Sequence, residues 1–88
     1  MLFFVKVRID IDHIDELARR LADDSLDRSA LRSTHCHRYD PEVGLNIWEA
    51  ETPAEFWHRF APHRAFYRDL LEVTPVITSG EAMRLLLE

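Results

Sequence analysis

Two hydrophobic periods alternate along the chain, and their order restricts the fold more than any other feature of the sequence. Residues 2–11 carry an apolar side chain at every second position, which is typical of a half-buried strand. Apolar side chains then recur at helical spacing over residues 14–21, which predicts an amphipathic helix. We expect this helix to be capped by Asp12 and to end near Asp24.

The middle of the chain has the pattern of a hairpin. A polar loop over residues 25–30 is followed by a second predicted strand over residues 31–39. Residues 40–44 are typical of a turn, because Pro41 fixes its own φ and the closing glycine accepts a positive φ. A third predicted strand then runs to about residue 50.

Two capping motifs start two further helices. Thr52-Pro53-Ala54-Glu55 joins a capping hydroxyl, a proline at the first helical position and a glutamate three residues after the cap. We expect Pro62 to interrupt that helix before a fourth strand over residues 70–77. Thr78-Ser79-Gly80-Glu81 repeats the cap. The order β-α-β-β-α-β plus a helix predicts a single ferredoxin-like α+β domain over residues 1–88, with both helices on one face of a four-stranded antiparallel sheet.

Size and charge limit the classes of function. A chain of 88 residues has a thin core, so we expect a homodimer or an assembly of dimers that covers the open face of the sheet. The single cysteine, Cys36, allows no intrachain disulfide and suggests a cytoplasmic protein. A net charge of −5 and the absence of a basic run argue against nucleic acid, and no stretch has the length of a membrane helix. With two glycines the chain has no phosphate-binding loop, and we expect no cofactor.

The open face of the sheet is the predicted functional surface. We expect the apolar alternation to face the helices, including Leu45 and Ile47 in the third strand. The register of the second strand depends on the hairpin loop. An even loop turns its histidines outward and Cys36 away, and an odd loop reverses this. With the even loop, the open face collects Lys6, Arg8, His35, His37, Tyr39, Asn46, Trp48 and Glu72.

These side chains have the composition of a small polar pocket with aromatic walls. His35 or His37 is the predicted catalytic base, because an imidazole titrates close to neutral pH. Lys6 or Arg8 would bind a substrate carboxylate, and the remaining members of the set would line the pocket as ligand-binding residues. The alternative is a solvated dimer interface in which Lys6 or Arg8 pairs with Glu72.

His35 and His37 also permit a metal hypothesis. Two histidines at i and i+2 of one strand can face one ion, and a third ligand would come from Glu72 or from a partner subunit. Histidines near a subunit interface are commoner than metal sites on strands. We therefore predict no bound metal and keep the metal site as an alternative.

The opening Met1-Leu2-Phe3-Phe4-Val5-Lys6-Val7 is similar to that of muconolactone isomerases, small enzymes of the dimeric α+β barrel superfamily. Arg38 and the hairpin as far as Trp48 also align with them. The tail from Asp69 to Ala82 resembles a family of short uncharacterised bacterial proteins of that fold. The resemblance implies two subunits that join their open sheet faces into a barrel around a cofactor-free cavity for small organic acids.

Muconolactone isomerases move a proton along a lactone ring with side-chain acids and bases, and Lys6 matches a position of their opening motif. The resemblance therefore implies a cofactor-free isomerase acting on a small organic acid or lactone. The alternatives are a non-catalytic protein that binds a small ligand, and a purely structural oligomer.

Overall fold

The alternating segment at the start of the chain forms strand β1, Leu2–Ile9, in a computed structural model that describes residues 1–88. All strand pairings in the sheet are antiparallel. The sheet has the order β2-β3-β1-β4, so that β3 and β1 are the inner strands. The other three strands are β2 (Leu31–His37), β3 (Asp40–Glu49) and β4 (Tyr67–Val76).

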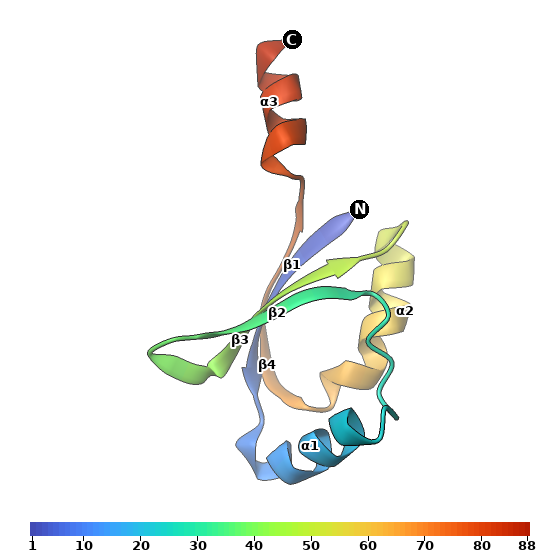
Figure 1. The fold of residues 1–88 in the computed structure, drawn as a ribbon, viewed down its shortest axis with the longest axis vertical. Helices are drawn as coiled ribbons and strands as arrows, with labels where there is room; N and C mark the ends of the chain where they lie inside the picture. Colours follow the sequence, from blue (N-terminus) through green and yellow to red (C-terminus); the bar gives the residue numbers. More distant parts are fainter.

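Two helices cover one side of this sheet, and a third stands apart from it (Figure 1). A 3₁₀ turn, Ile11–His13, leads into α1 (Ile14–Ala22), and α2 (Pro53–Arg64) connects β3 to β4. Helix α3 (Ser79–Leu87) follows β4 and points away from the sheet. The order β-α-β-β-α-β with an added helix confirms the predicted ferredoxin-like fold.

Two of the three predicted helix caps are present. Thr52 and Thr78 each accept a hydrogen bond from the amide of the glutamate three residues on, at 3.1 Å. The prediction for Asp12 was wrong. Asp10 is the capping residue, because its carboxylate accepts the amide of Asp12 at 3.1 Å and thereby starts the 3₁₀ turn. The α-helix itself begins at Ile14.

The hairpin turn lies two residues earlier than predicted. Arg38 and Tyr39 form it, and Asp40 already belongs to β3, where it pairs with His37. Pro41 has no amide hydrogen to donate to a neighbouring strand. It is tolerated because it lies among the first residues of β3, where a missing ladder hydrogen bond does little harm. The pairing of β2 with β3 changes register between Cys36 and His37, an irregularity of the kind that a β-bulge introduces.

Helix α2 also differs from its prediction, because it passes through Pro62 and ends at Arg64. The proline lies in the last turn of the helix, where it removes one backbone hydrogen bond without ending the helix, and the next side chain, His63, is buried. Strand β4 consequently begins at Tyr67, three residues before the predicted start.

Strand β3 presents the face opposite to the predicted one. Residues directly opposite each other in an antiparallel pair share a face, and Trp48 lies opposite the buried Phe3. Asn46 likewise lies opposite the buried Val5. The expectation that Asn46 and Trp48 lie on the open face was therefore wrong. Their side chains face the helices, with 5% and 1% of their surface exposed.

The reason for the reversal is the size of the indole. Trp48 packs edge-on against Phe56 and Phe60 of α2, with ring centroids 6.0 Å and 5.6 Å away. A tryptophan removes more apolar area from water than an isoleucine does, so its burial decides the face of the strand. Leu45 and Ile47 consequently lie on the open face, where both remain half-buried.

A register shift in β4 decides which of its two adjacent leucines packs against the core. The shift lies beside Lys6 and Val7, so that Leu70 rather than Leu71 stands opposite Val7 and packs against the core. Leu71 is exposed. The core itself lies between the sheet and α2.

None of the helices has the length and hydropathy of a membrane-spanning segment.

Candidate functional site

The two predicted open-face cations, Lys6 and Arg8, differ in their ion-pair partners. Lys6 lies opposite Glu72 on β4, as expected for a residue on the open face. Arg8 instead forms ion pairs with Asp40 at 3.3 Å and Glu42 at 3.2 Å, which raise the pKa of its guanidinium. Its charge is thus already paired within the chain.

The two predicted catalytic histidines lie near the end of the hairpin. His35 lies opposite Leu45 and therefore shares the open face. His37 accepts a hydrogen bond at Nδ1 from the amide of Tyr39, at 3.0 Å. Tyr39 occupies the turn with 85% of its surface exposed, so the expectation that it belongs to the second strand and faces the open side of the sheet was wrong. The physical reason is the two-residue turn, which ends β2 before this tyrosine.

The predicted metal set is also dispersed within the chain. His35 is on β2 and Glu72 on β4, the two outer strands of the sheet, about 14 Å apart at a spacing of 4.8 Å per strand. Glu72 accepts a hydrogen bond from Thr74 at 2.6 Å. No group of three or more histidine, cysteine, aspartate or glutamate side chains is close enough to hold a metal ion.

A cavity of about 180 Å³ lies instead between the helix-covered face of the sheet and α1. It exists because α1 buries none of its residues, so that Leu17 and Leu21 line the space without filling it. The wall is mainly aliphatic, with a few polar groups, which is the usual character of a small-molecule site. The polar lining residues are Arg28, Thr34, Cys36, Asn46, His63 and Tyr67.

Asn46 presents an amide to this cavity. Its Oδ1 accepts a hydrogen bond from Thr34 Oγ1 at 2.7 Å, and its Nδ2 has no hydrogen-bond partner in the chain. Gly44 lies beside it on the same face, and a Cβ on this glycine would approach Val7 Cγ2 to 2.9 Å. The glycine therefore lets the sheet pack closely beneath the cavity and leaves the amide of Asn46 accessible.

His63 supplies a proton acceptor to the same wall. Its Nε2 donates to the carbonyl oxygen of Asp27 at 2.6 Å, and a carbonyl can only accept, so the hydrogen of the neutral ring is on Nε2. Nδ1 then carries the lone pair. Burial lowers the pKa of this histidine, partly offset by the bond to Asp27, and favours the neutral form.

Accessibility distinguishes His63 from its neighbour in the core. Trp48 Nε1 is the single fully buried side-chain polar atom without a hydrogen-bond partner. His63 Nδ1 also makes no hydrogen bond in the chain, and the residue, although only 3% exposed, lines the cavity. A neutral imidazole with a free lone pair in a cavity wall can accept a proton from a bound molecule.

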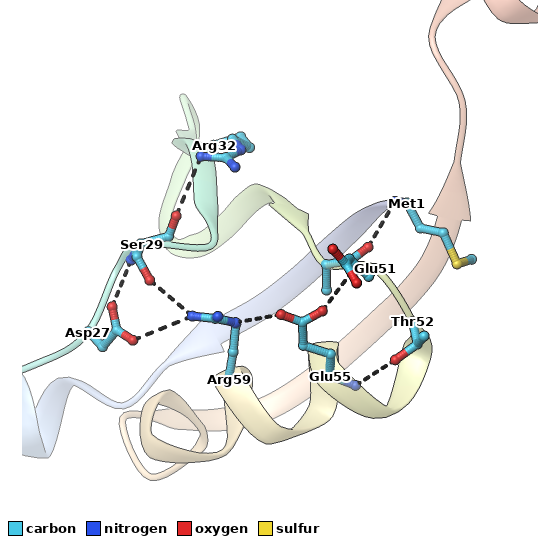
Figure 2. Close-up of polar contacts among 9 residues, drawn as sticks. Met1, Asp27, Ser29, Arg32, Glu51, Thr52, Glu55 and Arg59 are labelled. Atoms are coloured by element: carbon cyan, nitrogen blue, oxygen red, sulfur yellow. Dashed lines mark hydrogen bonds and ion pairs between the residues drawn. The ribbon is translucent and has the colours of Figure 1, made fainter.

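Arg59 of α2 contacts Asp27 and Ser29, two residues of the loop before β2, as Figure 2 shows. Arg59 donates to Glu55 at 3.0 Å and to the Ser29 hydroxyl at 3.1 Å, and its guanidinium lies 3.8 Å from the Asp27 carboxylate. That carboxylate also accepts the amide of Ser29 at 2.9 Å. Arg59 thus links the loop before β2 to α2, the helix that carries His63. It thereby holds in place the Asp27 carbonyl oxygen, the hydrogen-bond acceptor that determines the tautomer of His63.

The remaining polar groups complete the wall. Burial raises the pKa of Tyr67, with a smaller effect from Cys36, so the phenol stays protonated and can donate a hydrogen bond. Arg28 brings a positive charge, and its pair with Asp24 is long, at 3.5 Å, and exposed. An anionic molecule in the cavity could therefore compete for this guanidinium.

Sequence reasoning missed His63, although a signal was present. Phe56, Phe60 and His63 fall at i, i+4 and i+7, one stripe of a helix. The prediction that Pro62 ends the helix removed the histidine from that stripe. Asn46 was predicted as a ligand-binding residue and does line the cavity, but on the face opposite to the predicted one.

The sequence profile of a domain of unknown function, DUF3303, matches residues 1–88. The chain belongs to the DUF3303 family. No curated protein matches this DUF3303 chain. A crystal structure from Chloroflexus aurantiacus J-10-fl, provisionally described as an antibiotic biosynthesis monooxygenase, is 18% identical to it and has a TM-score of 0.46. The match covers 90% of this chain and 95% of that chain.

At that similarity the crystal structure carries no conclusion about chemistry. The resemblance of the DUF3303 chain to muconolactone isomerases stays a hypothesis based on its opening strand.

Proposed function

We propose that this protein binds a small carbonyl-bearing acid or lactone in the cavity between the sheet and α1 and moves a proton on it without a cofactor. The observation that carries the proposal is His63, held as the neutral Nε2–H tautomer by Asp27 in the wall of an otherwise aliphatic cavity. A cavity of about 150 Å³ is large enough for benzene, so about 180 Å³ suits one small ring with a substituent.

The proposed step conserves electrons and needs no second reactant. His63 Nδ1 takes a proton from the carbon next to the carbonyl, and the electron pair of that C–H bond moves to form the enolate. The amide of Asn46 and the hydroxyl of Tyr67 donate hydrogen bonds to the oxygen on which the charge develops. The imidazolium then returns the proton to another carbon of the conjugated system, and the product is an isomer of the substrate.

Arg28 would hold the carboxylate of such a substrate at the cavity wall. This assigns to Arg28 the role that the sequence suggested for Lys6 or Arg8. The reassignment is supported by the charge of Arg8, which Asp40 and Glu42 already neutralise.

The test uses a panel of small unsaturated acids and lactones of about one ring. Binding is followed by tryptophan emission in Trp57→Phe protein, and turnover by exchange of carbon-bound hydrogen for deuterium in NMR spectra. His63→Gln should retain binding and abolish exchange, because an amide cannot accept and return a proton at neutral pH. His58→Gln is the matched control, since His58 is exposed on the same helix.

The panel also separates the competing hypotheses. Binding without exchange would support a non-catalytic ligand-binding protein. If Lys6→Ala or His35→Gln abolishes binding while His63→Gln and Arg28→Ala do not, the cavity is not the binding site. That result would support a site on the open face of the sheet.

We further propose that the working unit is a homodimer that pairs the open sheet faces. The support is the composition of that face, where Phe4, Leu45, Ile47 and Val76 are half-buried and uncovered. Ile47→Glu should place a charge in the pairing surface and yield monomers by light scattering across a concentration range. An Ile47→Glu protein that stays dimeric would argue against the sheet pairing.

A further inference from the structure

Helix α3 buries none of its residues and lies beyond the end of the sheet (Figure 1). Glu81, Arg84 and Glu88 recur at i, i+3 and i+7, so they form a polar stripe along one side. Ala82, Met83 and Leu86 lie on the other side, where Met83 and Leu86 expose 54% and 79% of their surface. The apolar residues of the helix are Ala82, Met83, Leu85, Leu86 and Leu87.

A helix of this length is not stable by itself. Isolated helices shorter than about 12–15 residues are marginal in water, and α3 has nine. The cap at Thr78 satisfies one amide of its first turn. The remaining source of stability is burial of the apolar side, and no part of its own chain provides it.

The solvent-accessible area of the chain is larger than that expected for a compact monomer of its mass. The chain exposes 6119 Å². A compact monomer of its 10.4 kDa mass would expose about 5,400 Å². The excess of about 700 Å² is close to the roughly 800 Å² that each partner buries in a protein interface of standard size.

A groove at the base of α3 is the surface of matching character. The groove has a volume of about 560 Å³. Its apolar lining residues are Met1, Leu2, Pro75, Val76 and Ile77. Leu2 lies opposite Val76, so the groove continues the open face of the sheet to its end. The groove is thus contiguous with the surface proposed to pair two subunits.

We propose that α3 is an exchanged arm whose apolar side docks in this groove on a second copy of the chain, while the second copy's α3 docks in return. The groove also contains Thr78 and Glu81, where the arm begins. A two-fold axis near the groove therefore brings each arm close to its receiving surface, and a nine-residue helix reaches about 13 Å. Closed two-fold pairing also uses each apolar surface once and leaves none to propagate a filament.

The first test compares two variants of α3 by sedimentation across a concentration range. Met83→Glu/Leu86→Glu should raise the dimer dissociation constant at least tenfold, because two apolar side chains of the docking side can no longer enter the groove. Arg84→Gln, on the polar stripe of the same helix, should leave the constant unchanged. The core does not contain α3, so the near-UV spectrum of the double variant should match that of the wild type.

The second test locates the arm by disulfide formation in a Cys36→Ser background. An isotope-labelled chain with Leu86→Cys is mixed with an unlabelled chain with Leu2→Cys. The proposal expects a disulfide between labelled and unlabelled chains. It is overturned if a Leu2→Cys/Leu86→Cys chain closes its disulfide only within itself, or if the dissociation constant of the Met83→Glu/Leu86→Glu variant rises less than tenfold. If Ile47→Glu yields monomers while Met83→Glu/Leu86→Glu stays dimeric, the exchanged arm is refuted and the sheet pairing is retained.

Discussion

Trp48 and His63 meet edge to face, with ring centroids 4.8 Å apart and ring planes at 90°. One residue comes from the centre of the sheet and the other from the last turn of α2, so the pair joins the two layers of the fold. The contact excludes water from most of the imidazole, which is why burial dominates the pKa of His63. Its consequences can be measured without knowledge of any ligand.

The stability of the protein should fall between neutral and mildly acidic pH because of His63. In the unfolded chain its pKa is near the ordinary value of about 6.5, and burial lowers the pKa in the folded chain. The unfolded state therefore binds more protons in the window below about 6.5, and the free energy of unfolding decreases as pH falls through it. Thermal melts between pH 7.5 and 5 would measure this slope.

His13 must be removed from that measurement because its effect has the opposite sign. The hydrogen bond to Asp10 raises the pKa of His13, so it adds stability at low pH that is lost as pH rises through its folded pKa. In His13→Gln protein the slope should steepen, and adding His63→Gln should flatten it. A slope that survives His63→Gln would show that another group causes it.

Gly44 and Gly80 should respond in opposite directions to alanine. A Cβ at Gly44 would lie 2.9 Å from Val7 Cγ2, so Gly44→Ala must displace a buried valine and should cost about 1–3 kcal/mol. A Cβ at Gly80 meets only Thr78 Oγ1 at 3.9 Å, and alanine favours a helix by up to about 1 kcal/mol. Urea titrations of both variants would measure the two changes. Equal stabilities would contradict the close approach of β3 and β1.

Most of the fold could be predicted from the sequence because its signals are local. The alternation of β1 and the capping motifs at Thr52 and Thr78 depend on neighbouring residues and were confirmed. The turn at Arg38 and Tyr39 was missed because Pro41 and Gly44 carry stronger turn signals than the residues that form it. Pairing with β3 decided that position, and pairing is not a local property.

The site was less predictable, since both faces of β3 have apolar residues. Leu45 and Ile47 suggested one face toward the helices, whereas Trp48 required the other. Only the aromatic contacts with Phe56 and Phe60 decide between them, and those residues are distant in sequence. His35 still lies on the open face because the register shift between Cys36 and His37 turns β2 over relative to β3 and so compensates for the reversed face of β3.

Arg59→Gln should loosen the loop before β2 rather than unfold the protein. Its side chain is 40% exposed, so loss of its pairs with Glu55 and Asp27 should cost no more than about 1 kcal/mol. Amide exchange at Ser29 should accelerate, because the Ser29 hydroxyl and the Asp27 carboxylate, which fix this turn, both lose their contact with the Arg59 guanidinium. Arg19→Gln is the control, since Arg19 pairs only within α1 and at its end. Equal exchange at Ser29 in both variants would contradict the bracing role.

The emission of Trp48 should report the charge of His63 directly. Trp57→Phe removes the other indole, which lies partly exposed on α2. Protonation of His63 places a positive charge 4.8 Å from the centre of the Trp48 ring system, so the emission should change with pH. The midpoint should lie below about 6.5, because burial lowers the pKa of this histidine.

The same titration discriminates between the histidines of the chain. Adding His63→Gln to the Trp57→Phe background should abolish the transition, whereas His35→Gln and His58→Gln should preserve it. Both of those residues are exposed and distant from the indole packing that buries Trp48. A small acid or lactone bound in the cavity should shift the midpoint, since it would contact the atom that takes up the proton. A midpoint above 6.5 in the free protein would mean that Asp27 outweighs burial, and a midpoint above about 7 would leave His63 mainly cationic at neutral pH and unable to act as a base.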